Sequence, residues 1–299
     1  MPLTTTGELV AAARAGGHGV AAFNVITLEH AEAIAAGAEA AGAPAVLQIS
    51  ENAVRFHRGR LAPLAAATAA VAHASSAPLS LHLDHVVSAD LLHSAHGLGF
   101  SSVMFDASKL SYADNVKATA EAVRWAHEHA MWIEAELGRV GGKEGEKVGG
   151  DAGPGGREKA AEAPLDAHAP GVRTDPAEAV AYVTDTGVDA LAVAVGSSHA
   201  MTERTAALDQ ELIGRLRAAV AVPLVLHGSS GVPDAELRQA VAAGMVKINV
   251  GTALNTAFTG AVRGYLDAHP DVVDPRKYLA PGRDAMAATV RRFLEVVGG

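Results

Sequence analysis

Apolar runs of strand length alternate along the chain with longer, Ala-rich segments of helical period. Most of the short runs are apolar on both faces, which is typical of parallel strands covered by helices. The eight strands that we expect lie near residues 19–24, 45–50, 79–83, 102–105, 132–137, 190–195, 224–226 and 246–250. Segments such as 27–41, capped by Thr27 and closed by Gly42, and 90–98, closed by Gly99, read as the helices between them.

Strict alternation of eight strands with helices predicts an α/β fold, a (β/α)8 TIM barrel formed by residues 1–299 as one domain. An additional helix over 6–15 precedes the barrel, and a C-terminal helical extension over 284–297 follows it. A doubly wound open sheet is the alternative. It would normally carry a glycine fingerprint after its first strand, and residues 21–26 contain none.

Residues 138–174 interrupt this rhythm. The segment is rich in Gly, Pro, Glu and Lys, and it is too long for an ordinary strand-to-helix connection. Its composition fits either a mobile lid or an inserted segment without fixed structure. Its position after the fifth strand favours a mobile loop over the face that carries the polar residues described below.

Composition narrows the possible partners and metal ligands. The net charge of −9 and the lack of a basic stripe argue against nucleic acid. There is no cysteine among the 299 residues, so a transition metal must be held by His, Asp or Glu. The first residues lack a basic and apolar signal pattern, and no apolar stretch could span a membrane. We therefore expect a cytoplasmic protein.

Histidines and acids stand where the predicted strands end. Asp84 and His85 end the third strand, His199 follows the sixth, and His227 follows the seventh. Because the carboxyl ends of barrel strands meet on one face, three imidazoles there suggest zinc. The alternative is three unrelated loop histidines, since the chain contains 14 in all.

The fifth strand carries Glu134 and Glu136, which alternation places on the same side. Two buried carboxylates are costly unless they are paired or bound to a metal. Asp106, at the end of the fourth strand, could join Glu136 at a metal. Glu134 could instead be satisfied by backbone amides and water.

The last two strands are each followed by a loop of the phosphate-binding type. Gly228, Ser229 and Ser230 follow His227, and Gly251 and Thr252 open a helix after the eighth strand. This is the usual place for a phosphate in such barrels, because amides at a helix N-terminus bind anions. Ordinary turns use the same residue types.

Motifs in order along nearly the whole chain resemble those of the class II, zinc-dependent ketose-bisphosphate aldolases, the family of fructose- and tagatose-bisphosphate aldolases. The motifs that carry the resemblance are Phe23-Asn24-Val25, His82-Leu83-Asp84-His85, Ser102-Val103-Met104-Phe105-Asp106, Glu134-Ala135-Glu136-Leu137-Gly138, Gly141-Gly142-Lys143-Glu144, Leu226-His227-Gly228, Lys247-Ile248-Asn249 and Asp274-Pro275-Arg276.

The resemblance implies a role for each matching residue. Asp84 is the acid/base at the aldehyde oxygen, and Glu144 is the carboxylate associated with proton removal from the ketose. The implied metal residues are His85, His199 and His227 for the catalytic Zn2+, and Asp106 and Glu136 for a second, non-catalytic metal. The positions that match contacts to dihydroxyacetone phosphate are Asn24, Ser50, Gly228, Ser230, Asn249 and Thr252.

The resemblance also implies a homodimer or homotetramer, in which Arg276 reaches the distal phosphate of a neighbouring subunit's ketose. Three positions differ from the family pattern: Ala200 and Ser229 replace glycines, and Gly251 replaces an Asn or Asp. They surround the phosphate and the place of a monovalent cation, Na+ or K+. The expected activity is cleavage or formation of fructose 1,6-bisphosphate or tagatose 1,6-bisphosphate.

Other functions use the same residues differently. Lys247 near a strand end could form a Schiff base, or it could simply pair with a carboxylate. A metal-dependent hydrolase would need a water-activating arrangement, and no His-x-His pair ends the first strand. An aldolase for another phosphorylated ketose or for a deoxy-gluconate phosphate is a further alternative. A non-catalytic phosphosugar-binding barrel is the non-enzyme alternative.

Overall fold

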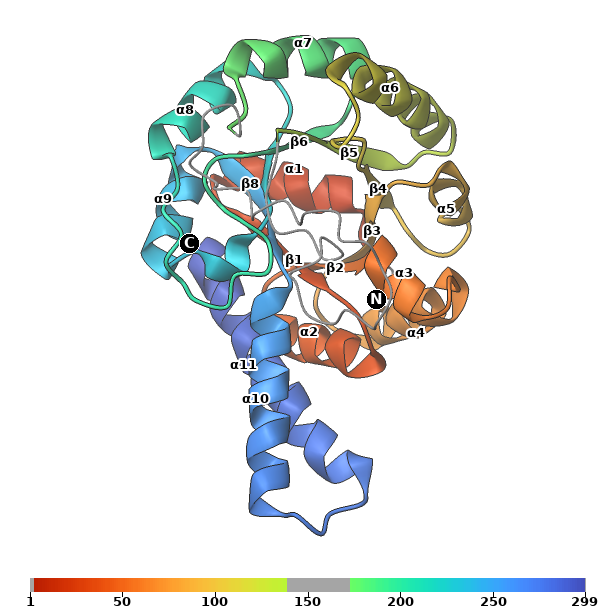
Figure 1. Ribbon diagram of the computed structural model, residues 1–299, viewed down its shortest axis with the longest axis vertical. Coiled ribbons are helices and arrows are strands. Elements are labelled where there is room, and N and C mark those ends of the chain that lie inside the picture. The colour runs from red at the N-terminus through yellow and green to blue at the C-terminus, as the bar shows by residue number, and fades with distance from the viewer. Residues whose placement is uncertain (1–2, 139–172, 299) are drawn as a thin grey trace, which may run out of the picture.

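A closed barrel of eight parallel strands in sequence order forms the centre of the computed structural model, which describes residues 3–138 and 173–298 (Figure 1). The strands are β1 (Val20–Asn24), β2 (Ala45–Ser50), β3 (Leu79–Val86), β4 (Ser102–Phe105), β5 (Trp132–Leu137), β6 (Ala190–Val193), β7 (Leu224–Leu226) and β8 (Met245–Val250). β8 pairs with β1 and closes the sheet. The TIM barrel is thus confirmed, and the open-sheet alternative is wrong.

Helices surround the strands, as the alternating pattern requires. They are α1 (Thr6–Gly16), α2 (Leu28–Ala41), α3 (Glu51–Phe56), α4 (Leu61–Ala74), α5 (Ala89–Ser94), α6 (Tyr112–Glu128), α7 (Pro176–Thr186), α8 (Gln210–Ala219), α9 (Asp234–Ala243), α10 (Thr252–Ala268) and α11 (Pro275–Val297), with a 3-10 turn η1 (Ser229–Gly231). In the described part of the chain, no helix is both long and apolar enough to cross a bilayer.

Helix α1 covers the barrel at the amino ends of the strands. A capping box begins it, in which Thr5 and Glu8 exchange hydrogen bonds. The Thr6 hydroxyl lies 3.0 Å from Ser80 Oγ and accepts a 2.6 Å hydrogen bond from Ser102 Oγ, so the helix is joined to β3 and β4 by buried hydroxyls. The opposite, carboxyl end of the barrel stays open for the polar residues.

Some predicted boundaries are wrong for local reasons. Helix α11 begins at Pro275 rather than at 284, because Asp274 accepts a hydrogen bond from Arg276 N (3.0 Å) and proline suits the first helical turn. Helix α5 ends at Ser94 rather than at 98, and Gly97 and Gly99 then follow with positive φ. Strand β3 runs three residues past the predicted end, to Val86.

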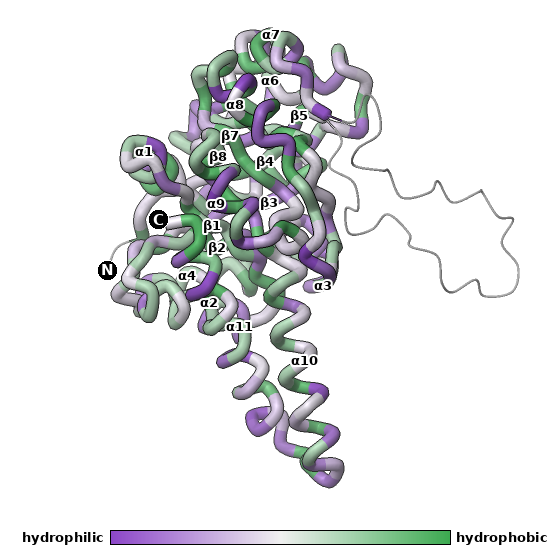
Figure 2. Tube along the Cα trace, turned by 90° about the vertical axis from the view of Figure 1, so that its left-hand side faces the viewer, coloured by the Kyte–Doolittle hydropathy of each residue, from purple (hydrophilic) through white to green (hydrophobic). Residues whose placement is uncertain are grey.

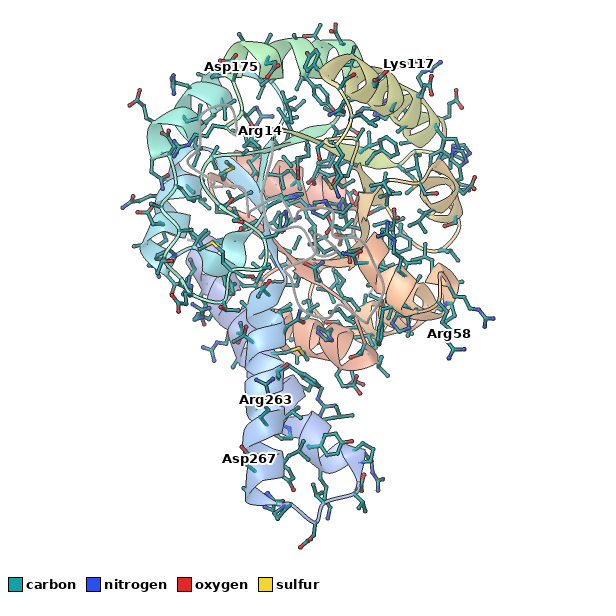
Figure 3. The ribbon with its side chains drawn as sticks, viewed as in Figure 1. Arg14, Arg58, Lys117, Asp175, Arg263 and Asp267 are labelled. Carbon is teal, nitrogen blue, oxygen red and sulfur yellow. The ribbon has the colours of Figure 1, made fainter. Side chains whose placement is uncertain are left out.

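The end of α10 and the beginning of α11 form a hairpin that projects from the barrel (Figures 1 and 2). Its surface is mixed in hydropathy, with charged side chains such as Arg263 and Asp267 pointing outward (Figure 3) and Val273 91% exposed at its tip. The rest of α11 returns to the barrel, where Met286, Val290 and Phe293 are buried. We call residues 258–283 the projecting hairpin.

Candidate active site

A cavity of about 330 Å³ opens at the carboxyl ends of the strands. The predicted site residues that line it are Asn24, Ser50, Asp84, His85, Asp106, His199, Gly228, Ser230, Asn249 and Thr252. They come from strand ends that are far apart in the sequence. The fold therefore brings together nearly all the residues that we identified.

An irregularity at the end of β3 lets two consecutive residues face this cavity. Neighbouring residues of a regular strand point to opposite sides, so Asp84 and His85 could not both do so. The pairing of β3 with β4 shifts register between Leu83 and Val86, and His85 adopts the left-handed conformation with φ 50°. This local bulge turns both the carboxylate and the imidazole into the cavity.

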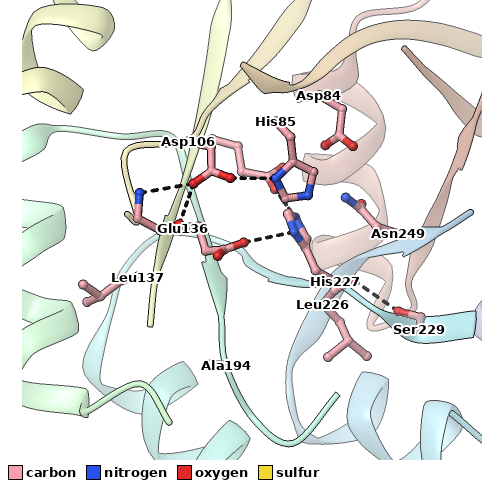
Figure 4. Close-up of polar contacts among 12 residues, drawn as sticks. Asp84, His85, Asp106, Glu136, Leu137, Ala194, Leu226, His227, Ser229 and Asn249 are labelled. Atoms are coloured by element: carbon pink, nitrogen blue, oxygen red, sulfur yellow. Dashed lines mark hydrogen bonds and ion pairs between the residues drawn. The ribbon is translucent and has the colours of Figure 1, made fainter. Parts of the chain in front are cut away.

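Three imidazoles converge beside Glu136, as Figure 4 shows for His85 and His227. The ring centres are 4.8 Å apart for His85 and His227, 5.2 Å for His85 and His199, and 5.6 Å for His199 and His227. One ligand atom from each histidine and one from Glu136 all lie within 4.8 Å of one another. Glu136 thus lies with the histidines, although the resemblance places it with Asp106 at a second metal.

Carboxylates hold two of the rings in place. Asp106 Oδ2 lies 2.9 Å from His85 Nδ1, which leaves Nε2 of His85 for another partner. Glu134 Oε1 lies 2.9 Å from His227 Nε2, and Glu136 Oε2 lies 3.3 Å from His227 Nδ1. Burial disfavours a charged His227, but these two carboxylates outweigh it and raise the pKa of His227 to about 9.

The donor set suits a zinc ion. Three imidazole nitrogens with a carboxylate nearby are ligands that Zn2+ prefers, and the chain offers no thiolate. Carboxylates behind His85 and His227 orient the rings, as is usual for metal-binding histidines. In solution, binding of the ion would displace the proton that the raised pKa of His227 indicates.

Asp84 is a buried carboxylate next to this cluster. Burial alone would raise its pKa, but His85, His227 and Lys247 together lower it below the usual value for aspartate. Asp84 Oδ1 has no hydrogen-bond partner among the described residues, and His82 Nε2 lies 3.9 Å from it. The carboxylate is therefore ionised and able to accept a proton from a bound molecule.

The loops that follow β7 and β8 form another wall of the cavity. Gly228 has φ 67°, and a Cβ there would lie 2.5 Å from the carbonyl oxygen of Ser198, so only glycine fits. Ser230 Oγ accepts a 3.0 Å hydrogen bond from Ala253 N and so joins the loop after β7 to the start of α10. Thr252 opens α10 on the cavity, and the N-terminus of a helix favours negative charge.

Several cavity residues were missed in the sequence. Arg55 and Lys109 line the mouth and are cations that could meet a phosphate, and Glu51 forms an ion pair with Arg55. Glu51 and Arg55 follow Ser50 in α3, so their nearness to the site could have been inferred from the position of Ser50. Lys247 Nζ lies 2.8 Å from Glu134 Oε2. The pairing with a carboxylate that we considered for Lys247 is therefore observed, and so is the paired state that we considered for Glu134.

Two predicted residues belong neither to the cavity lining nor to the histidine cluster as described. Arg276 lies on the projecting hairpin, where its guanidinium pairs with Asp274 (2.8 Å) and its side chain is 89% exposed. Glu144 falls within residues 139–172, outside the described residues, as does most of the loop predicted over 138–174.

Comparisons with known proteins agree with the sequence motifs. The model of the class II fructose-bisphosphate aldolase family matches residues 4–299. A fructose-bisphosphate aldolase from Geobacillus stearothermophilus is 36% identical over 97% of this chain and 95% of its own length. The crystal structure of the YdjI aldolase from Escherichia coli K12 superposes with a TM-score of 0.80 at 28% identity, covering 99% of this chain and 97% of that one. A Campylobacter jejuni fructose-bisphosphate aldolase, at 20% identity and a TM-score of 0.76 over 99% and 95% of the two chains, shares the fold.

Proposed function

Because the chain belongs to the class II fructose-bisphosphate aldolase family and is therefore a metal-dependent lyase, we propose that it is a zinc-dependent ketose 1,6-bisphosphate aldolase. Its substrate would be fructose 1,6-bisphosphate or tagatose 1,6-bisphosphate. Cleavage between C3 and C4 would give dihydroxyacetone phosphate and glyceraldehyde 3-phosphate. The observation that supports this most strongly is the ionised Asp84 next to three converging histidines.

The chain's own residues would divide the work. His85, His199 and His227 would hold the ion, which when bound supplies Lewis acidity for negative charge that develops on the ketose oxygens. Asp84 would accept the proton of the C4 hydroxyl as the bond breaks, and it would return that proton in the direction of synthesis. Asn24, Ser50, Gly228, Ser230, Asn249 and Thr252 would bind the dihydroxyacetone phosphate half.

Metal removal tests the proposed cofactor. Exhaustive chelation should abolish cleavage and leave the circular dichroism spectrum nearly unchanged, because the barrel core is apolar and does not need an ion to hold it together. Zinc should restore the activity. Full activity with no metal detected by elemental analysis would contradict the proposal.

A panel of phosphorylated ketoses tests the proposed substrate. Triose-phosphate release should be fastest with one of the two bisphosphates and should depend on zinc. Release from a deoxy-gluconate phosphate alone would favour the alternative aldol reaction. Tight binding without cleavage of any ketose would favour a phosphosugar-binding barrel.

Other roles from the resemblance stay predictions. Glu144 would remove a proton from the bound ketose, so Glu144→Gln should slow exchange of that proton and leave zinc content unchanged. Asp106 and Glu136 would bind a second, non-catalytic metal. Na+ or K+ would assist phosphate binding. Activity measured in buffers that contain only one of these cations would show which of them is needed. The assembly would be a homodimer or a homotetramer.

A further inference from the structure

Lys247 lies at the middle of a buried line of polar contacts that runs beneath the cavity. Its Nζ lies 2.9 Å from Asn249 Oδ1 and 2.8 Å from Glu134 Oε2. Glu134 Oε1 lies 2.9 Å from His227 Nε2. The line therefore joins β8, β5 and the residue that follows β7, and it connects an amide that lines the cavity to one of the three clustered histidines.

Among the described residues, Lys247 is the only buried lysine or arginine, and its side chain is 0% exposed. A buried ammonium is costly unless charged and polar partners surround it, and here Glu134 supplies the opposite charge.

An ammonium group can only donate hydrogen bonds, which fixes how its partners are oriented. Asn249 must present its amide oxygen to Lys247, so its NH2 group is left for the cavity. Glu134 uses Oε2 for Lys247 and accepts from His227 Nε2–H with Oε1. His227 then has only Nδ1 with which to bind a metal.

We propose that Lys247 is a positioning residue that sets both halves of the site. Through Glu134 it holds His227 in the tautomer that binds metal through Nδ1, and through Asn249 it turns an amide NH2 group toward the substrate. The metal half does not depend on which substrate is used. The substrate half rests on the proposed function.

The test compares Lys247→Met, the double variant Lys247→Met/Glu134→Gln, and Asn249→Ala. Zinc affinity of the metal-stripped proteins is measured by competition with a chromophoric chelator. The KM for the ketose bisphosphate is measured at saturating zinc. Lys117→Met, on the outer helix α6, is the matched control, and it should behave like the parent in both measurements (Figure 3).

Lys247→Met should weaken zinc binding about 10- to 100-fold, as is usual when support behind a metal ligand is lost, and it should raise KM. In the double variant, the neutral amide that replaces the Glu134 carboxylate can still accept from His227 Nε2–H without a buried unpaired charge. Zinc affinity should therefore largely recover, whereas KM should stay high because Asn249 still lacks its partner. Asn249→Ala should raise KM and leave zinc affinity unchanged.

Parent-like zinc affinity and KM in Lys247→Met would overturn the proposal. Recovery of both quantities in the double variant would refute the Asn249 half. If Lys247→Met does not fold, the double variant and Asn249→Ala provide the test of the proposal. Loss of zinc affinity in Asn249→Ala would overturn the separation into a metal half and a substrate half. If zinc affinity responds as expected but the parent cleaves no ketose bisphosphate, the proposed substrate is wrong and the metal half stands.

Discussion

At the scale of single residues, the site depends on backbone geometry as much as on side-chain identity. The sequence predicted that Asp84 and His85 belong to one site, but in a regular strand these neighbouring residues would point to opposite faces. The bulge at the end of β3 and the left-handed conformation of His85 bring both into the cavity. A left-handed histidine is rare and costs roughly 1 kcal/mol or more, so the surrounding structure must hold it in place.

Asp84→Ala should lower turnover by roughly two to four orders of magnitude, the range for a positioned acid or base. Zinc content should stay close to that of the parent, because the carboxylate is not one of the clustered ligands. Turnover and metal content of the same preparation are the measurements. Near-normal turnover would move the proton-transfer role to another group, with Glu144 the first to examine.

Gly251→Ala should raise the KM for the phosphorylated ketose. A Cβ at Gly251 would lie 2.7 Å from Asn24 Oδ1, so the Asn24 amide must move and lose its 3.0 Å hydrogen bond from Gln48 Nε2. Gly260→Ala in α10 is the control, since nothing lies within 4 Å of its added methyl group. An unchanged KM in Gly251→Ala would show that Asn24 does not contact the substrate.

At the scale of elements, hydrophobic periodicity was sufficient to predict the strands of the barrel but not the exact bounds of the helices that connect and follow them. All eight strands appear where fully buried apolar runs predict them, because burial on both faces leaves a strong pattern. The start of α11 was missed because cap residues are a weaker signal than periodicity. The sequence left several possible roles for Lys247, of which pairing with a carboxylate was one. Alternation along a strand shows toward which side a residue points, but it does not identify the partner across the barrel.

The buried His82 in strand β3 should make the free energy of unfolding depend on pH. Burial and the charge of Lys247 lower the pKa of His82 to about 3, below the ordinary value of about 6.5 in an unfolded chain. Between pH 6.5 and 3 the unfolded chain therefore binds a proton that the folded protein does not. Its contribution to stability is complete above pH 6.5 and is lost as the pH falls through this window.

His82→Asn should flatten this dependence by about one proton, which corresponds to about 1.4 kcal/mol per pH unit at most. Urea unfolding of metal-free parent and variant at several pH values from 7.5 to 4.5 measures the difference between the two slopes. The parent and the variant share every other titrating group, including His227, so the comparison isolates His82. Parallel curves would show that buried His82 does not resist protonation.

At the scale of the whole molecule, the projecting hairpin extends well beyond the barrel (Figure 1). Arg276 lies in the first turn of α11 on this hairpin, exposed and outside the cavity of its own chain. An arginine suits bidentate recognition of a phosphate. Because Arg276 lies outside the cavity of its own chain, it could contact a substrate phosphate only in the active site of a second subunit. The hairpin is the part of the described chain that could carry it there.

Arg276→Ala should raise the KM for bisphosphate substrates and leave the affinity for dihydroxyacetone phosphate and zinc nearly unchanged. Arg263→Ala, on the same hairpin, is the matched control (Figure 3). Sedimentation of both variants reports whether the oligomer persists. A monomeric parent with normal bisphosphate kinetics would refute the role, and an oligomer in which Arg276→Ala is silent would favour a substrate with one phosphate.

Closure of the barrel by its two ends has a consequence for synthesis of the protein in the cell. β1 has its second neighbour only in β8, Gly19 N donates a 2.7 Å hydrogen bond to Val297 O, and α11 packs on α2. We therefore expect the first strand to keep one edge unpaired until β8 has been translated and has left the ribosome. Nascent chains stalled before α11 should thus be digested by protease at residues that the released protein protects.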